Sequence, residues 1–218
     1  MKFKLLLLAA VLVITVSFTR STAAQSQPET KTPAIYADIS FGYGRTIFFG
    51  RLANEQATRE ARGFSPSSGF NAAFFFYVQI NAIRGLGVGG GGKGFTAGRA
   101  SGGDNEEFFF NYYHFGASAR YHFLTQRFND GPYVKANLGF GQFTQKTRFN
   151  ASKTYEHQFA IGTVVLIGAG YSFPVSGTTA INVFAEYEYA SRNGDVTGEG
   201  QGISFQNGQL SLNAGISF

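Results

Sequence analysis

The last ten residues, QLSLNAGISF, alternate strictly between apolar and polar side chains. A period of two puts successive side chains on opposite faces of a strand, so this segment predicts a strand with one apolar and one polar face. The apolar face carries Leu210, Leu212, Ala214, Ile216 and Phe218. In a sheet built from such segments, the apolar face has to be shielded from water, and the polar face has to contact water or other polar groups.

Seven earlier segments predict strands as well, most of them with the same alternation. They lie at 34–44, 70–82, 85–99, 107–123, 132–143, 158–173 and 181–190. The segment at 158–173 has a less regular phase, because Val164 and Leu166 fall on its polar side. Each segment reaches the roughly 9–11 residues that a tilted strand needs to cross the hydrocarbon layer.

The connections between these segments alternate in length. Short ones lie near 82–85, 125–131 and 174–179, and mostly longer, polar ones near 51–68, 100–106, 146–156 and 191–204. Short turns at one end and long loops at the other are typical of barrels that cross a membrane. The sequence over 34–218 therefore predicts an all-β fold, an eight-stranded antiparallel transmembrane up-and-down β-barrel.

Composition favours the membrane over water as the surroundings of this barrel. The chain holds 25 phenylalanines and 11 tyrosines. A soluble, ligand-holding barrel is the alternative, and it would have to direct its apolar faces inward. Eight strands enclose a lumen barely wide enough for side chains, so we expect most rings to face lipid and the polar faces to line the lumen.

The N-terminal residues have the order of a secretory signal peptide: Lys2 and Lys4, an apolar run over 5–18, then small residues up to Ala24. We expect cleavage after Ala24, which makes 1–24 the signal peptide and 25–33 a polar periplasmic leader. The alternative, a retained anchor, is disfavoured because the apolar run is shorter than the roughly 20 residues of a spanning helix. Without Lys2, Lys4 and Arg20 the net charge falls from +5 to +2, which gives no indication of a nucleic-acid partner.

The glycine-rich run at 85–94, GLGVGGGGKG, resembles a phosphate-binding loop only superficially. Gly94 stands where the nucleotide motif needs a Ser or Thr, and the residues that follow do not predict the helix that such a loop requires. In a barrel strand, Gly87, Gly89 and Gly91 would face the lumen and leave room for long neighbouring side chains, and Lys93 shares their face.

The polar faces carry both signs of charge. We expect these groups to form ion pairs across the lumen, because an unpaired charge in a dry lumen costs several kcal/mol. The alternative is that they line a narrow path for ions or small solutes. The expected lumen network consists of Asp38, Glu186 and Glu188, of Lys93, Arg120 and Lys135, and of His114, with His122 as a further member.

On its architecture and its terminal aromatic residue, Phe218, the chain over 34–218 resembles the small bacterial outer-membrane β-barrels of the OmpA transmembrane-domain and OmpX type. The resemblance implies a location in the bacterial outer membrane and insertion by the barrel-assembly machinery, with Leu212, Ile216 and Phe218 in the C-terminal assembly signal. Unlike for full-length OmpA, we expect no peptidoglycan-binding domain after the barrel.

For function, the sequence favours a monomeric, non-enzymatic envelope protein with a structural or surface-binding role, whose extracellular loops bind an unidentified ligand. The alternative of a rim catalyst involves Ser152, Glu156 and His157, residue types that are common in polar loops. The chain has no cysteine, and its histidine and carboxylate spacing indicates no metal site or cofactor.

Overall fold

Eight strands of 12 to 19 residues carry the fold, as the alternating pattern predicts. The computed structural model describes residues 35–61, 67–97, 100–101, 107–125, 127–148, 156–195 and 202–218, so the expected signal peptide and leader lie outside the described residues. The strands are β1 (Ile35–Phe49), β2 (Ser68–Gln79), β3 (Leu86–Ala97), β5 (Glu107–His122), β6 (Gly131–Arg148), β7 (Glu156–Pro174), β8 (Ala180–Asp195) and β9 (Ile203–Ser217), with a two-residue β4 (Ala100–Ser101) and one helix, α2 (Arg51–Ala61).

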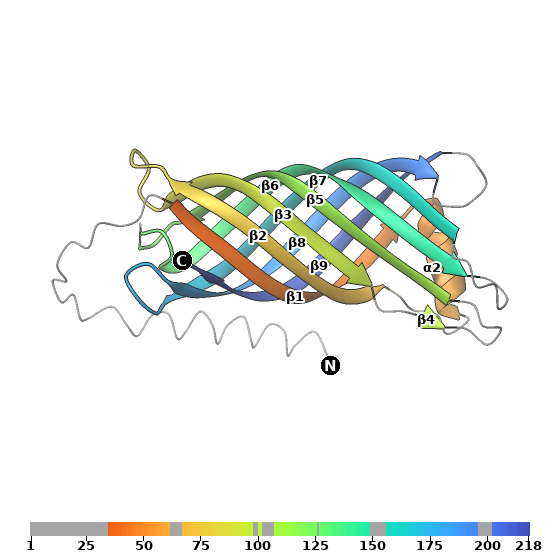
Figure 1. The fold of residues 1–218 in the computed structure, drawn as a ribbon, viewed down its shortest axis with the longest axis horizontal. Coiled ribbons are helices and arrows are strands. Elements are labelled where there is room, and N and C mark those ends of the chain that lie inside the picture. Colours follow the sequence, from red (N-terminus) through yellow and green to blue (C-terminus); the bar gives the residue numbers. More distant parts are fainter. Residues whose placement is uncertain are drawn as a thin grey trace. The chain divides into compact units, whose positions relative to one another are not determined.

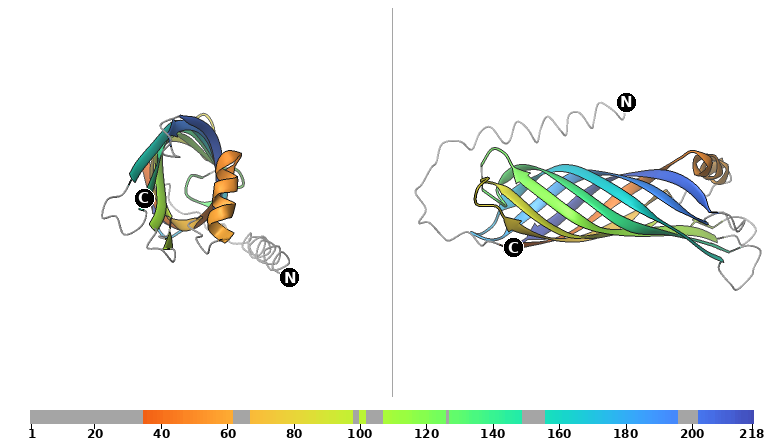
Figure 2. Two further views of the ribbon diagram at one scale, coloured as in Figure 1. Left: turned by 90° about the vertical axis from the view of Figure 1, so that its right-hand side faces the viewer. Right: turned by 90° about the horizontal axis from the view of Figure 1, so that it is seen from above.

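Each long strand pairs antiparallel with its neighbours along the chain, and β1 pairs with β9 to close the ring. Viewed along the barrel axis, the strands form a closed outline (Figure 2). The last residue takes part in the closure: the Phe218 amide donates to the Ala37 carbonyl at 2.9 Å, and the Ala37 amide donates back at 2.8 Å. The fold class is therefore confirmed as an eight-stranded up-and-down barrel.

The glycines of β3 explain how this strand fits between β2 and β5. A Cβ atom on Gly89 or Gly91 would collide with the backbone oxygen of Phe76 or Phe74 on β2, and a Cβ on Gly87 would collide with the Phe128 ring inside the barrel. The glycine run therefore permits close strand approach and makes room in the lumen.

Helix α2 lies within the segment at 51–68 that the sequence analysis assigned to a loop. Gly50 turns the chain from β1 into the helix with φ +68°, a conformation that favours glycine. The sequence of α2, RLANEQATREA, is rich in strong helix formers, and Gln56 donates a hydrogen bond to Glu60 one turn later. The two views place α2 and β4 at the end opposite the C terminus (Figures 1 and 2). No described helix is long and apolar enough to cross a membrane.

Candidate functional site

The exterior of the barrel is apolar along every long strand. Phe41, Phe70, Leu138 and Leu212 are 65 to 70% exposed. Along each strand, the residues that alternate with such exposed residues point inward. So much exposed apolar surface on a closed barrel has to be covered by hydrocarbon, which rules out the soluble alternative. The long-loop end is then extracellular and the short-turn end periplasmic, because this is the arrangement of outer-membrane barrels.

The periplasmic part of the lumen holds Asp38 and Arg120, both predicted as lumen residues. The Arg120 guanidinium lies 3.1 Å from the Asp38 carboxylate and 4.1 Å from the centroid of the Tyr133 ring. Asn182 donates to the same carboxylate at 2.9 Å. Because the guanidinium is buried, its ion pair and its aromatic contact together replace the water that it has lost.

The two histidines lie in different parts of the lumen. His122 is beside this periplasmic network, with its Nε2 3.1 Å from the Ser172 hydroxyl, which in turn donates to Asn182 at 2.7 Å. His114 lies farther toward the extracellular end, where its Nδ1 is 3.6 Å from a carboxylate oxygen of Glu188.

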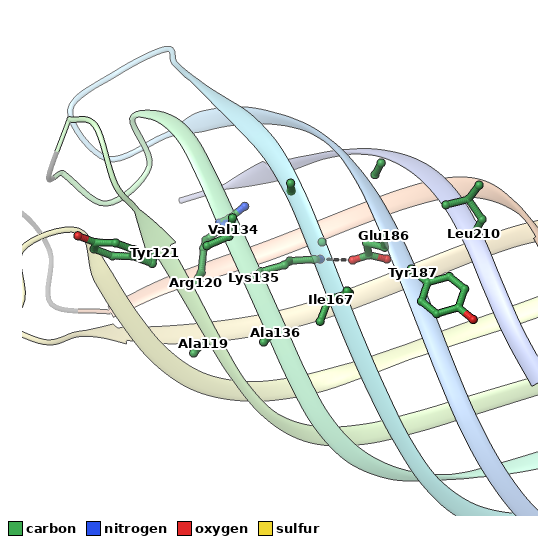
Figure 3. A pocket seen from close by; sticks show the side chains of 13 residues that line it. Ala119, Arg120, Tyr121, Val134, Lys135, Ala136, Ile167, Glu186, Tyr187 and Leu210 are labelled. Atoms are coloured by element: carbon green, nitrogen blue, oxygen red, sulfur yellow. Dashed lines mark ion pairs between the residues drawn. The ribbon is translucent and has the colours of Figure 1, made fainter. Parts of the chain in front are cut away.

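The middle of the lumen is organised around Glu186 and Glu188 on β8. Lys93 lies 3.1 Å from Glu186 and 3.4 Å from Glu188, and Lys135 forms a second ion pair with Glu186. Figure 3 shows Lys135 on β6 reaching across β7 to Glu186 on β8. All four side chains are buried. The structure therefore brings all eight predicted network residues, His122 included, into the lumen. Five of them form this central cluster: Lys93, His114, Lys135, Glu186 and Glu188.

Arg192 also belongs to the lumen, although it was not among the predicted network residues. It lies 3.8 Å from Glu188, donates to the Asn207 side-chain oxygen and stacks over the Tyr112 ring at 5.0 Å. The predicted strand ended at Ala190, although continuing the alternation by two residues would have identified Arg192. Among the buried side chains of the described residues, four Lys and Arg therefore face three carboxylates.

An aromatic cluster lies in the extracellular part of the lumen. Stacked and edge-on ring contacts join its members, for example Phe95 with Tyr112 at 4.9 Å and Phe110 with Phe143 at 5.4 Å. Leu52 of α2 packs against the cluster and anchors the helix. We call this set the aromatic plug: Phe48, Phe95, Phe108, Phe110, Tyr112, Phe143 and Phe205. The expectation of a mainly polar filling was therefore incomplete, because these seven rings share the inward faces with others such as Phe128 and Tyr133.

On β7, Val164 and Leu166 are fully buried inside the barrel. These two residues made the phase of this strand ambiguous in the sequence. Both side chains therefore lie on the inward face of β7.

The side chains of the catalytic alternative lie outside what the structure describes. Glu156 and His157 begin β7, and Ser152 lies outside the described residues. Within the described ranges, no group of three His, Cys, Asp or Glu side chains is arranged to hold a metal ion.

Comparison with known proteins supports the fold. No family model matches the chain, and no curated protein does either. Two solved structures match with a TM-score of 0.51: Ail, the attachment invasion locus protein of Yersinia pestis, in complex with the heparin analogue sucrose octasulfate, and Neisserial surface protein A. The chain has the fold of the small outer-membrane β-barrels. The chain is 18% identical to Ail and 17% identical to the Neisserial protein. Each alignment covers 85% of this chain, together with 100% of the Ail chain and 96% of the Neisserial chain.

The resemblance that the sequence suggested is thus confirmed at the level of the fold. The location follows from the fold together with the exterior. A closed antiparallel barrel with an apolar outer band is the form that proteins of the bacterial outer membrane take, because it leaves no backbone group unpaired in lipid. The chain is an outer-membrane barrel.

Proposed function

We propose that this protein is a non-enzymatic, monomeric outer-membrane barrel with a closed lumen, which acts through its extracellular end as a surface-binding protein. One observation carries the proposal: the lumen is filled at successive heights, by the Asp38–Arg120 pair, by the Glu186 and Glu188 cluster and by the aromatic plug. A barrel filled in this way serves as a scaffold, and its loops supply the specificity.

The filling argues against the alternative of a narrow channel. Phe110 and Phe143 have no solvent exposure, and Arg120 and Arg192 are 1 to 2% exposed. Conduction would require these rings and ion pairs to separate, and a buried pair that loses one partner costs about 3–5 kcal/mol.

The extracellular end offers polar groups for binding. Helix α2 is anchored through Leu52 and exposes Asn54, Thr58 and Glu60 at the rim. The names of the two similar structures are consistent with a surface role: one is an attachment protein that was solved with a heparin analogue, and the other is a surface protein. The proposed surface role rests in part on this likeness, and the ligand of this chain is unidentified.

Two measurements test the proposal. Planar-bilayer recordings of the refolded barrel are expected to show no discrete conductance steps. Discrete steps would overturn the closed-lumen proposal. Cells that display the barrel are expected to adhere to a host-cell or matrix surface, and to lose adhesion when residues 196–201 are deleted. A matched deletion in the periplasmic turn, at 176–178, should leave adhesion unchanged, and equal adhesion by both variants would contradict the surface role.

The C-terminal strand supports the proposed assembly signal. Leu212, Ile216 and Phe218 project from its lipid-facing side and are 49 to 70% exposed. Before β9 pairs with β1, this face and the free strand edge are both available to the barrel-assembly machinery. Replacing Phe218 by Ser is expected to slow insertion in cells while leaving refolding in detergent intact.

A further inference from the structure

A groove of about 720 Å³ runs over the outer surface of the barrel across β1, β2, β3, β5 and β6. Its lower part is apolar: Ala72 and Gly94 form the floor, and the rings of Phe41, Phe70 and Tyr113 form the walls. These side chains face outward, so the groove opens to the hydrocarbon of the membrane.

The floor is open at Gly94 in a way that it is not elsewhere on β3. A Cβ atom added to Gly94 would meet no atom within 4 Å, whereas one added to Gly92 would collide with the Phe115 ring. The missing side chain at Gly94 therefore leaves a surface depression that no neighbouring residue fills.

The upper part of the groove, nearer the extracellular end, is polar. Thr96, Asn111 and Thr144 are direct cross-strand partners on β3, β5 and β6 and form one row. Lys146 lies two residues beyond Thr144, and its ammonium is 5.5 Å from the centroid of the Phe109 ring. Among the described residues that line the groove, Lys146 is the one charged side chain.

We propose that this groove binds an anionic, phosphate-bearing lipid of the outer leaflet. One acyl chain lies along Ala72 and Gly94 between Phe70 and Tyr113, and the phosphate lies beside Lys146 with hydrogen bonds from Asn111 and Thr144. Charge complementarity selects an anionic headgroup, since the lining offers a cation and hydrogen-bond donors but no carboxylate. The direction also agrees: the apolar part is toward the middle of the membrane and the polar part toward its outer surface.

A second exterior groove provides the contrast. It runs over β5 to β9, and its outward lining is apolar or aromatic, including Ala119, Ala136 and Ile167. The charged residues that border it, such as Lys135 and Glu186, direct their charges into the lumen (Figure 3). This groove can hold an acyl chain but offers nothing to a phosphate, so it serves as the internal control.

The test uses the whole barrel, refolded in non-ionic detergent and examined by native mass spectrometry. The probes are dimyristoyl phosphatidic acid, dimyristoyl phosphatidylcholine and inorganic phosphate. We expect the native chain to retain phosphatidic acid in preference to phosphatidylcholine. Lys146→Gln should weaken phosphatidic acid binding about fivefold and leave phosphatidylcholine binding unchanged, since one lysine near the headgroups contributes this much to the attraction of an anionic lipid. Gly94→Leu should weaken the binding of both lipids.

Matched controls separate the groove from general effects of charge and bulk. Arg45→Gln removes an exposed charge at the same end of the barrel, and Ala136→Leu places a leucine side chain in the second groove; neither should change the preference for phosphatidic acid. Equal retention of both lipids by the native chain, or unchanged retention by Lys146→Gln, would overturn the proposal. Displacement of the lipid by millimolar inorganic phosphate would also overturn it, since it would identify a site for free phosphate. If Gly94→Leu fails to fold, Lys146→Gln decides the outcome alone. Conductance does not enter this test, so it is independent of the proposed function.

Discussion

Glu186 is the acidic centre of the lumen, and replacing it by glutamine tests whether the lumen is dry. In the native chain the Glu186 carboxylate pairs with Lys93 at 3.1 Å and with Lys135, and Asn213 donates to it at 3.3 Å. The amide of Glu186→Gln keeps the size of the side chain and loses its charge. Lys93 retains Glu188 at 3.4 Å, whereas the carboxylate partner of Lys135 is removed.

The size of the effect follows from this burial. All three charged side chains are at most 4% exposed, and removing one partner of such a pair destabilises the fold by about 3–5 kcal/mol, because a buried charge is left uncompensated. The variant also raises the excess of positive charge in the lumen by one. Combining it with Lys135→Met restores the original excess, so the double variant should recover most of the lost stability.

The assay is urea unfolding of the barrel in phospholipid vesicles. Because the chain has no tryptophan, the folded fraction is read from the fast-migrating band of unboiled samples on SDS gels. Glu60→Gln is the matched control: it breaks the exposed pair between Arg45 and Glu60, 3.8 Å apart, and such surface pairs contribute only about 0–1 kcal/mol. A loss for Glu186→Gln as small as that of Glu60→Gln would mean that water solvates the lumen, and the closed-lumen reasoning would fail.

Three further predictions concern the lumen-facing and lipid-facing sides of the barrel strands. Phe110→Ala removes a ring that has no solvent exposure and contacts the rings of Phe48 and Phe143, so it should lower the free energy of unfolding in vesicles by about 3–5 kcal/mol; a loss below 1 kcal/mol would argue against a packed plug. Leu138→Arg places a charge on the lipid-facing side near the middle of β6 and should cost about 2–4 kcal/mol in the same assay, whereas no cost would place Leu138 outside the hydrocarbon. A spin label at Leu212 should be relaxed by oxygen dissolved in lipid, and one at Asn213 should be shielded from it; the reverse result would invert the barrel.

The direction of each side chain could be predicted from the sequence because it is a local property. A period of two assigns each residue to one face of its strand without reference to any partner. Leu212 was predicted to face lipid and Asp38 to face the lumen, and this is where the structure has them. The composition then decided which face meets lipid, because eight strands cannot enclose every ring.

Several features were missed although the pattern contained part of the signal. Arg192 and Phe205 lie on the inward parity of β8 and β9, but beyond the predicted ends of these strands. Phe110 and Tyr112 lie on the inward parity of a predicted strand and were passed over in favour of the outward rings. Helix α2 was missed because the polarity of its segment suggested a loop, although its residues have high helix propensity.

The sequence by itself determined the number of strands, the face on which each residue lies and the order of short and long connections. Only the tertiary structure decided which inward groups meet. Asp38 and Asn182 are 144 positions apart, and Lys93 and Glu186 are 93 apart. The periodicity of a strand carries no information about height or angle around the barrel, and these are set by the register of all eight strands once the ring has closed.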